Sequence, residues 1–275
     1  MRPSICKHLV LLIVLVLPVV TGAWASPAAE AAGSTDGSTP YTFITWNISK
    51  NDARNNEVKR LIRQYRPDIL CLQEATSRTC EQLQHRFYCH FAPSWKVANR
   101  DIHNGVLTAS RHKLQNPARF ESTDREFVFA TTKAAMVSTI AVDDAADLMV
   151  INVHMLNFVG LGAFNDQLKE IFQHARAHTG PMIWCGDFNT WNSARLKAVH
   201  QYAARLGMVE ALAYHKSGGT PSAWTLLVDP FIEIHQGALL DRIFCRGFEV
   251  LECKRLSGFA SSDHPPMLLR ARLLD

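Results

Sequence analysis

Five short segments of the sequence place acids, amides or a histidine directly after a stretch that is typical of a buried strand. Side chains at the ends of strands in a packed sheet can be held rigidly at a cleft. Carboxylate, carboxamide and imidazole groups bind hard cations, orient water and carry protons. One such segment alone is more often a turn or a solvated cap, but five together favour a catalytic cleft. The segments are Trp46-Asn47, Gln73-Glu74, Asn152-Val153-His154, Gly186-Asp187-Phe188-Asn189 and Ser262-Asp263-His264.

Strand-like and helix-like stretches alternate along the chain and supply the elements that would position these segments. Runs of β-branched and aromatic residues indicate strands, and apolar residues at three- and four-residue spacing indicate amphipathic helices. Because strands outnumber helices and both occur throughout, we predict an α/β or α+β fold with a large sheet core. Expected strands are 41–48, 68–73, 127–142, 147–154, 182–185, 240–246, 248–255 and 267–273, and expected helices are 58–65, 164–175 and 196–206.

Residues 1–25 have the organisation of a secretory signal peptide. Arg2 and Lys7 precede the apolar run Leu9–Val20, and Ala23-Trp24-Ala25 is a small-x-small cleavage motif. The apolar run is shorter than the roughly 20 residues that a membrane-spanning helix needs, so an N-terminal membrane anchor is only the alternative. We therefore expect a secreted or periplasmic protein that has no stable membrane span after cleavage.

The rest of the chain divides into a short linker and one domain. Residues 26–40 are small, polar and rich in turn-forming types, whereas no comparable stretch interrupts residues 41–275. With 47% hydrophobic and 20% charged residues, the chain is not collagen-like, a coiled coil or wholly disordered. A formal net charge of +4 is too small for a protein that coats nucleic acid, but it is compatible with an enzyme that binds individual phosphates. A monomer is expected.

Six of the seven cysteines lie outside the N-terminal segment, and an even number is compatible with disulfides in an oxidising compartment. Cys80 and Cys89 are close in sequence and flank a helix-to-strand passage, which makes them the first candidate pair. Cys71 and Cys185 lie in apolar strand-like runs, where buried thiols are expected. Because the chain has no Cys-x-x-Cys motif, a structural zinc site is disfavoured.

In their order and spacing, the motifs TWN, LQE, NVH, GDFN, LDRIF and SSDHPP resemble those of the endonuclease/exonuclease/phosphatase superfamily, which has the DNase I-like fold. GDFN and SDHPP are the most specific of them. The resemblance extends from Tyr41 to the C-terminus, and VINVHMLNF and GDFNTWNSARLKAV are similar to an uncharacterised bacterial branch. It implies a four-layer fold, in which two mixed β-sheets pack face to face between helices, and divalent-metal-dependent hydrolysis of phosphate esters.

Residue chemistry indicates a metal site at the same motifs. Mg²⁺ prefers oxygen ligands and keeps several waters, so one or two carboxylates suffice. Glu74 is the first expected ligand, with Asn47 beside it and Asp263 as a further carboxylate. Mg²⁺ is the expected cofactor, with Mn²⁺ as a substitute.

Hydrolysis of a phosphate ester also requires an oriented water, a neutralised phosphate and a group that transfers protons. We expect Asp187 to orient or deprotonate the water and Asn189 to donate a hydrogen bond to a non-bridging oxygen. His154 would donate to the phosphate as charge develops. His264 would act as a general acid or base, with its tautomer and charge fixed by Asp241.

Two further assignments stay open. Some nucleases of the superfamily use a second acid to orient the histidine that corresponds to His154, and Asp101 and Glu126 are the two guesses for it here. Asn157, three residues after His154, either contacts the phosphate or forms a turn.

We expect the protein to be an exported phosphodiesterase, and nucleic acid is the favoured substrate because it is the commonest one in the superfamily. A basic cluster after the first strand is compatible with it, although a solvated helix face would give the same pattern. The cluster consists of Arg54, Lys59, Arg60, Arg63 and Arg66.

Two other functions stay open. A phospholipid or inositol phosphate is the alternative substrate, because apolar residues in loops near the motifs would suit contact with a bilayer surface. The third hypothesis is a non-catalytic binding subunit on the same scaffold, which the intact set of polar motif residues disfavours. The apolar loop residues are Trp191, Trp224, Leu226, Leu227, Phe231 and Ile232.

Overall fold

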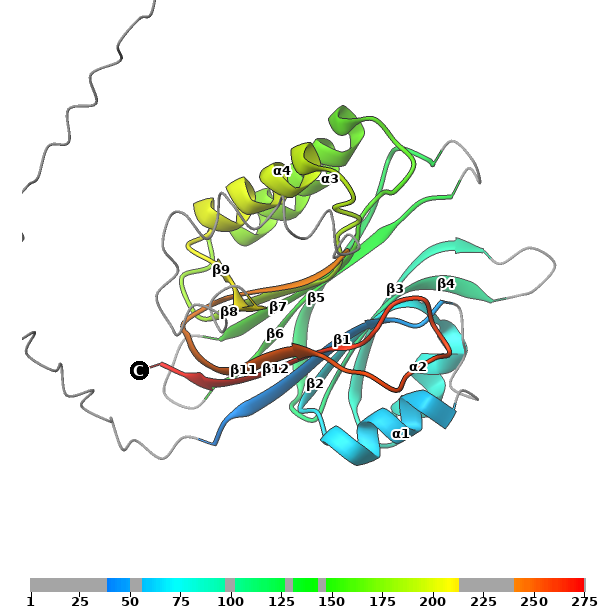
Figure 1. The fold of residues 1–275 in the computed structure, drawn as a ribbon, viewed down its shortest axis with the longest axis vertical. Helices are drawn as coiled ribbons and strands as arrows, with labels where there is room; N and C mark the ends of the chain where they lie inside the picture. The colour runs from blue at the N-terminus through cyan, green and yellow to red at the C-terminus, as the bar shows by residue number, and fades with distance from the viewer. Residues whose placement is uncertain are drawn as a thin grey trace, which may run out of the picture. The chain divides into compact units, whose positions relative to one another are not determined.

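Two six-stranded β-sheets form the centre of the structure (Figure 1). The computed structural model describes residues 39–49, 56–96, 102–126, 131–142, 147–212 and 240–274. In spatial order, sheet A contains β11 (Phe248–Arg255), β12 (Met267–Leu273), β1 (Tyr41–Asn47), β2 (Ile69–Thr76), β4 (His103–Ser110) and β3 (Tyr88–Lys96). Sheet B contains β5 (Leu114–Glu121), β6 (Ala134–Ile140), β7 (Leu148–His154), β8 (Met182–Asp187), β10 (Asp241–Arg246) and β9 (Val209–Glu210).

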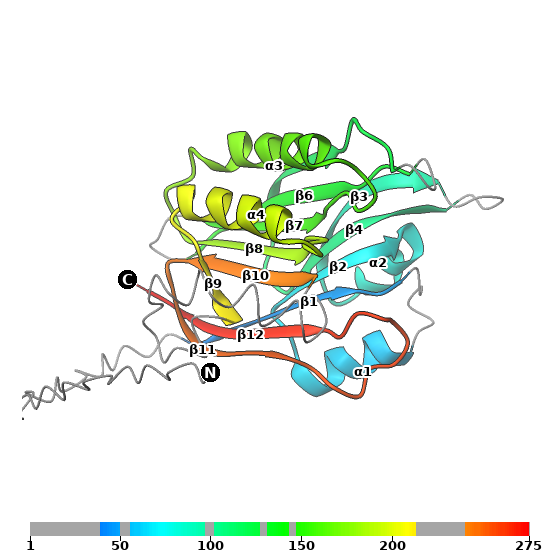
Figure 2. The same cartoon turned by 45° about the horizontal axis from the view of Figure 1, so that its top comes forward.

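Two helices cover the outer face of each sheet (Figure 2): α1 (Asn56–Tyr65) and α2 (Ser77–Leu83) on sheet A, and α3 (Leu161–Ala175) and α4 (Ser193–Arg205) on sheet B. Successive side chains of a strand point to opposite faces, which explains these layers. On β1, Ile44 and Trp46 pack with α1, whereas Phe43 packs in the core between the sheets. The predicted four-layer α/β architecture is therefore confirmed.

Each sheet contains one parallel pair among its described strands. The two pairs occupy corresponding positions in their sheets, although the sequence shows no repeat. β1 and β2 are connected through α1, and β7 and β8 are connected through α3. In both sheets the parallel pair has antiparallel neighbours on either side. Both strands of a parallel pair end at the same sheet edge. This places Asn47 near Glu74, and His154 directly opposite Asp187.

The three predicted helices, and strands β1, β2, β7, β8, β10, β11 and β12, occur where the sequence indicated them. Residues 127–130 of the expected strand 127–142 lie outside the described residues, and most of its remainder forms β6. No bounds were predicted for α2, β3, β4, β5 or the two-residue strand β9. Of these, β3 and β5 are edge strands of mixed burial that contain Pro93 and Pro117, so they lack the pattern of a buried strand.

The cysteines of the described chain are free thiols. Cys71 and Cys185 are buried between the sheets, as expected, and hydrogen-bond to each other. Cys80 on α2 and Cys89 on β3 also form a side-chain hydrogen bond, which lowers the pKa of Cys80 to about 7 and raises the pKa of Cys89. No bond joins these two sulfurs in the structure, so the Cys80–Cys89 disulfide stays a prediction.

Residues 1–38, which contain the expected signal peptide and most of the expected linker, lie outside the described residues. Residues 213–239, which contain most of the apolar loop considered for contact with a bilayer, lie outside them too. Within the described part of the chain, no helix combines the length and the apolar character that crossing a membrane requires.

Gly186 precedes Asp187 on β8 and allows this strand to pass close to the backbone of β7. Its φ is +140°, and a Cβ atom at this position would lie 2.0 Å from the carbonyl oxygen of Val153. We expect Gly186→Ala to lower the free energy of unfolding by about 3 kcal/mol or more, measured by urea denaturation. The control is Gly162→Ala on α3, where nothing lies within 4 Å of the added Cβ. A Gly186→Ala protein as stable as the control would contradict this account of the strand pair.

Candidate active site

One cavity at the shared edge of the two sheets contains nearly all of the predicted site residues. Its volume is about 790 Å³. It lies where β1, β2, β7 and β8 end, and the loop before β12 contributes to it. Asp241, at the start of β10, contacts this group through His264. The predicted residues that line the cavity are Asn47, Glu74, His154, Asn157, Asp187, Asn189, Asp263 and His264.

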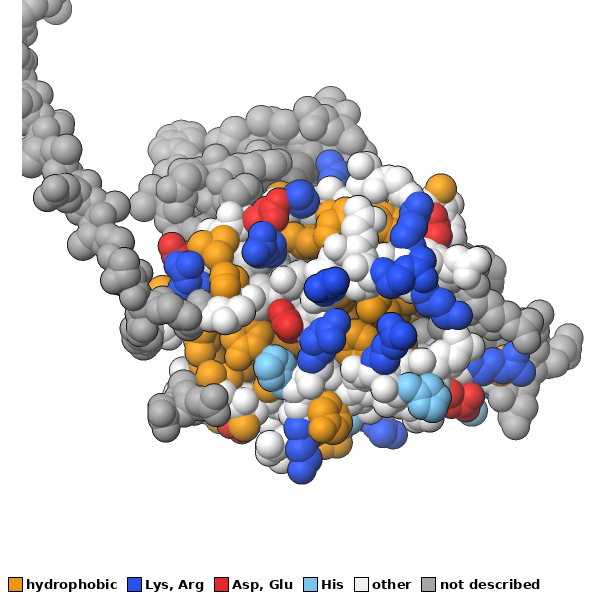
Figure 3. Space-filling model, turned by 90° about the horizontal axis from the view of Figure 1, so that it is seen from below, with side chains coloured by type: hydrophobic (Ala, Val, Ile, Leu, Met, Phe, Trp, Pro, Cys, Tyr) orange, Lys and Arg blue, Asp and Glu red, His pale blue; other side chains and the backbone are white. Residues whose placement is uncertain are grey.

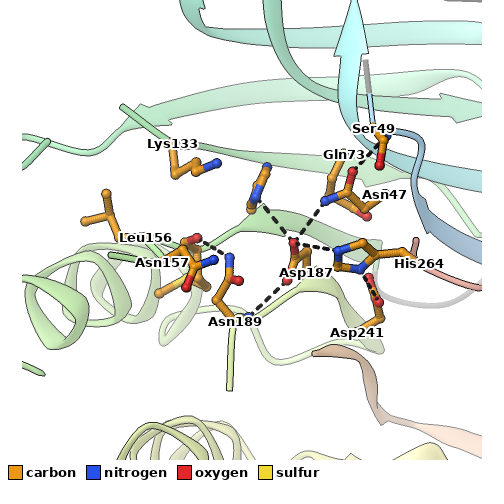
Figure 4. A network of polar contacts seen from close by, with 12 residues as sticks. Asn47, Ser49, Gln73, Lys133, Leu156, Asn157, Asp187, Asn189, Asp241 and His264 are labelled. Carbon is orange, nitrogen blue, oxygen red and sulfur yellow. Dashed lines mark hydrogen bonds and ion pairs between the residues drawn. The ribbon is translucent and has the colours of Figure 1, made fainter. Parts of the chain in front are cut away.

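The carboxylate of Asp187 is the centre of the polar network in this cavity (Figure 4). Asn47 donates from Nδ2 to Asp187 Oδ2 at 3.0 Å, and the Nε2 atoms of His154 and His264 lie 3.4 and 3.9 Å from the same oxygen. The other carboxylate oxygen accepts the backbone N–H of Asn189 at 3.0 Å. Since Asn47 belongs to sheet A and Asp187 to sheet B, this carboxylate joins the ends of both sheets.

Burial and neighbouring charges give Asp187 and His264 different affinities for protons. Asp187 is 2% exposed, and its burial, together with the nearby Asp241, raises its pKa to about 7. Burial lowers the pKa of His264, but a hydrogen bond of 2.7 Å between its Nδ1 and Asp241 Oδ2 outweighs this and raises the pKa to about 9. At neutral pH His264 is therefore a cation, while Asp187 can gain or lose a proton. Such a pair is suited to acid–base chemistry.

The loop before β12 carries Asp263 and His264, and hydrogen bonds hold it against the end of β1. Trp46 donates from Nε1 to the carbonyl oxygen of His264 at 2.8 Å. Ser49 donates from its hydroxyl to Asp263 Oδ1 at 2.8 Å, which lowers the pKa of that carboxyl. The position of the imidazole therefore depends on the local structure of β1.

Arg195, on α4, fixes the loops that follow β7 and β8. Its side chain is 1% exposed, and it donates to the carbonyl oxygens of Leu156 at 2.7 Å and Val159 at 2.9 Å in the first loop. It also donates to the carbonyl oxygen of Asn189 at 3.2 Å in the second loop. The guanidinium packs over the ring of Phe164, 4.6 Å from its centroid. One buried cation thus holds together the two segments that carry Asn157 and Asn189.

A second set of hydrogen bonds joins the two sheets just below the cavity, in the interior of the protein. Gln73 donates from Nε2 to Asn152 Oδ1 at 2.7 Å and to Thr45 Oγ1 at 3.0 Å. Asn152 in turn donates to the carbonyl oxygen of Leu107 at 3.0 Å. Both amides are fully buried and neither lines the cavity. The motif residues Gln73 and Asn152 therefore hold the sheets in register.

The three residues predicted to bind a metal fit a hard divalent cation in their chemistry, because Asn47, Glu74 and Asp263 offer only oxygen to it and line the same cavity. The lowered pKa of Asp263 keeps that carboxylate charged. A neighbouring group, formed by Asp187, Asp241 and His264, has ligand atoms within 4.8 Å of one another.

Backbone strain is concentrated at this site. Glu74 and Asn189 both have a φ of +50°, and Ser49 has a φ of +49°. A positive φ is uncommon for residues other than glycine, and it persists where the surrounding structure enforces it. In Asn189 this turn lets the side chain donate to the carbonyl oxygen of Met155 at 2.8 Å while its backbone N–H bonds Asp187.

The cavity also has a basic and aromatic lining that the sequence did not indicate. Lys96, Arg125, Lys133, Trp95 and Phe158 contribute to it. Lys133 lies across the polar network from His264 (Figure 4). Trp95, Lys96, Arg125 and Lys133 come from segments that carry no recognisable motif. Phe158 ends the motif VINVHMLNF but was not predicted to line the cavity, so only the fold shows that these residues lie close together.

Glu126, one of the two acids considered for orienting His154, lines the cavity and holds the loop that carries Asn157. It accepts hydrogen bonds from the backbone N–H of Asn157 at 2.7 Å and from the Thr131 hydroxyl at 2.9 Å. Lys133 Nζ lies 3.7 Å from it. The acid found next to His154 is Asp187, and the other guess, Asp101, lies outside the described residues.

The family relationship follows from a match over most of the chain. A model described as the Endonuclease/Exonuclease/phosphatase family matches residues 44–264, a span that includes every predicted site residue. The chain belongs to the endonuclease/exonuclease/phosphatase family. Members of this family hydrolyse phosphate esters and generally depend on a divalent metal.

Bacterial members of the family are similar to this chain over most of their length. A UPF0294 protein from Klebsiella pneumoniae is 28% identical in an alignment of 267 positions that covers 92% of this chain and 90% of that protein. A UPF0294 protein from Erwinia tasmaniensis is 29% identical in an alignment of 240 positions that covers 82% of this chain and 79% of that protein. The predicted resemblance to a bacterial branch is therefore confirmed.

Solved structures of the endonuclease/exonuclease/phosphatase family share the fold. The catalytic domain of human Nocturnin with a bound sulfate anion has a TM-score of 0.63 at 19% identity, covering 85% of this chain and 94% of that one. The family member from Beutenbergia cavernae has a TM-score of 0.62 at 16% identity, covering 86% and 72%. At such identities the likeness establishes the architecture.

Arg195→Met should lower kcat for phosphate-ester hydrolysis by about 10- to 100-fold, because Asn189 and the loop after His154 lose their common anchor. Arg195→Lys should restore part of this loss. Arg205→Met is the control on the same helix, since that guanidinium packs over the rings of Phe172 and Tyr202 and has no hydrogen bond to the two loops among the described residues. Initial rates and thermal melts test the expectation, and an Arg195→Met protein with the kcat of the control would contradict it.

Proposed function

We propose that this protein is a Mg²⁺-dependent phosphodiesterase that hydrolyses nucleic acid. The observation that carries the proposal is the convergence of Asn47, His154 and His264 on the Asp187 carboxylate, in a cavity that is also lined by basic side chains. The first group can handle water and protons, and the second can bind phosphates.

Each side chain near Asp187 has a role that its contacts allow. With a pKa of about 7, Asp187 can orient a water and accept its proton near neutral pH. His264, which Asp241 keeps protonated, can donate to a phosphate oxygen or to the leaving group. One amide hydrogen of Asn189 bonds Met155, which leaves the second for a non-bridging oxygen.

Glu74, Asn47 and Asp263 would hold the metal ion. When bound, Mg²⁺ supplies positive charge at the phosphate oxygens and makes a coordinated water more acidic. Their position in the same cavity as Asp187 and His154 supports a site in which the ion and the proton-handling groups serve one phosphate.

The lining of the cavity supports nucleic acid over other phosphate esters. Lys96, Arg125 and Lys133 provide positive charge beyond the reacting phosphate, as a chain of phosphodiesters requires. Trp95 and Phe158 lie in the same lining, and Phe158 is 47% exposed, so a base can stack on it. Basic residues interleaved with aromatic ones are typical of surfaces that bind single strands.

Metal removal provides the first test. Hydrolysis of an oligonucleotide should stop in EDTA and return with Mg²⁺ or Mn²⁺, because carboxylate and amide oxygens bind these ions. Glu74→Gln should raise the Mg²⁺ concentration for half-maximal rate by about tenfold or more, since it removes a charged ligand. Glu170→Gln, on the exposed face of α3, is the matched control. Full turnover in EDTA by protein that is verified to be metal-free would refute the metal-dependent mechanism.

Substitution of the proton-handling residues provides the second test. His264→Ala and Asp187→Asn should each lower kcat/KM by about 10²–10⁴-fold without unfolding the protein. Asp241→Asn should have a smaller effect than His264→Ala, because it disorients the imidazole but retains it. The matched control is Asp166→Asn, an exposed acid on α3.

DNA, RNA, sphingomyelin and phosphoinositides should be offered side by side in these assays, with thermal melts of every variant. Near-normal turnover of a well-folded His264→Ala protein would contradict the site assignment. Turnover of the lipids alone would contradict nucleic acid as the substrate but not the hydrolytic site.

A further inference from the structure

A second cavity lies at the opposite end of sheet A from the candidate active site. It has a volume of about 630 Å³ and is lined by four arginines over an apolar floor of Ile62 and Phe87. The strand β2 starts beside this cavity and ends at the active site, so the two are separated by roughly 25 Å, the length of eight residues in a strand. The arginines are Arg63, Arg66, Arg86 and Arg111.

Three separate parts of the chain bring these arginines together. Arg63 lies in the last turn of α1 and Arg66 follows that helix, whereas Arg86 precedes β3 and Arg111 follows β4. Figure 3 shows that Lys and Arg side chains gather on the face of the molecule that carries α1. Arg63 and Arg66 of the expected basic cluster therefore share this cavity with two arginines that are distant in the chain, whereas Arg54 of that cluster lies outside the described residues.

The four guanidinium groups have no acidic partner within the described part of the chain. Arg60, one turn earlier on α1, pairs with Glu57 at 3.0 Å, but no such ion pair involves the arginines of the cavity. The nearest acid along the chain, Asp68, accepts the backbone N–H of Thr42 at 2.8 Å. Four like charges that share a cavity repel one another, and an anion would remove that repulsion.

Arg111 is held in place, and Arg66 has an unusual backbone conformation. Arg111 donates from Nε to the carbonyl oxygen of Pro67 at 2.9 Å and packs over the ring of Phe87, 5.3 Å from its centroid. Arg66 has a φ of +47° directly after α1, a position where glycine or asparagine is preferred. This backbone conformation costs free energy for a residue with a Cβ atom such as arginine. The arginine at this position adds a positive charge to the cavity.

We propose that this arginine-lined cavity is a second binding site, distinct from the active site, for a phosphate-bearing anion. Guanidinium groups match phosphate oxygens in geometry and form two hydrogen bonds at once. Four of them exceed the charge of one phosphate dianion, so a diphosphate or a group of closely spaced phosphates is the expected ligand class. This class includes soluble diphosphates and the headgroups of anionic lipids.

Calorimetric titration of the full chain with inorganic pyrophosphate tests the proposal, in EDTA and at about 0.15 M salt, where weak surface attraction is screened. The cavity variant combines Arg63→Gln with Arg86→Gln. The control combines Arg78→Gln on α2 with Arg176→Gln after α3; both are exposed and outside the cavity, and the charge change is the same. The cavity variant should bind pyrophosphate about tenfold more weakly or worse, whereas the control should stay within about twofold of the wild type.

Co-sedimentation with vesicles distinguishes the two sources of phosphate. Vesicles of phosphatidylcholine alone are compared with vesicles that also contain phosphatidylglycerol. Loss of binding to the anionic vesicles in the cavity variant alone would support a lipid headgroup, and loss of pyrophosphate binding alone would support a soluble ligand. Equal weakening in the control, or no binding of either probe by the wild type, would overturn the proposal.

Hydrolysis by the cavity variant provides the last check. Its rate should equal that of the wild type, because the cavity lies at the far end of β2. A well-folded cavity variant with reduced turnover of the nucleic-acid substrate would place the cavity on the substrate's path and overturn a separate site.

Discussion

The buried carboxylate of Asp187 is the interaction on which the rest of the site depends. It lies at the end of β8, yet it accepts a hydrogen bond from Asn47 at the end of β1, in the other sheet. Both candidate catalytic imidazoles approach the same oxygen. A buried charge is tolerated only when its partners are in place. A shift of one sheet against the other would therefore lower the stability of the protein and, at the same time, separate the residues of the site.

The register of the sheets is therefore part of the chemistry. Gln73 and Asn152 hydrogen-bond across the interface just below the cavity, and neither can find water there if the sheets slide. Leaving such amides without partners costs about 1–3 kcal/mol each, which is large against the net stability of a domain. The apolar core between the sheets supplies most of the attraction, but it is not directional. The buried amides are what select one alignment.

Side-chain patterning predicted a large sheet core and most of the site residues, whereas the four layers were implied by the resemblance to the endonuclease/exonuclease/phosphatase superfamily. Asn47, His154, Asp187 and His264 each follow a strand-like run or lie in a specific motif, and two parallel pairs bring their ends to one edge. The role of Arg195 was not predictable, since its hydrogen bonds go to backbone carbonyls that no motif records. The basic residues that line the cavity were not predicted either, because their positions also depend on the tertiary structure.

Lys133 and Arg125 lie between the edge strand β5 and its neighbour β6, where the approach of a side chain to the cavity depends on tertiary structure alone. Much of the same applies to the arginines at the other end of sheet A, which three separate turns bring together. Strand interiors are constrained by two packed faces, whereas the segments beyond their ends are constrained only by what they must bind or avoid. Charged side chains that do not stabilise the fold therefore occur at both ends of β2. The group around the Asp187 carboxylate lies where β2 ends, and the group of arginines lies where β2 begins.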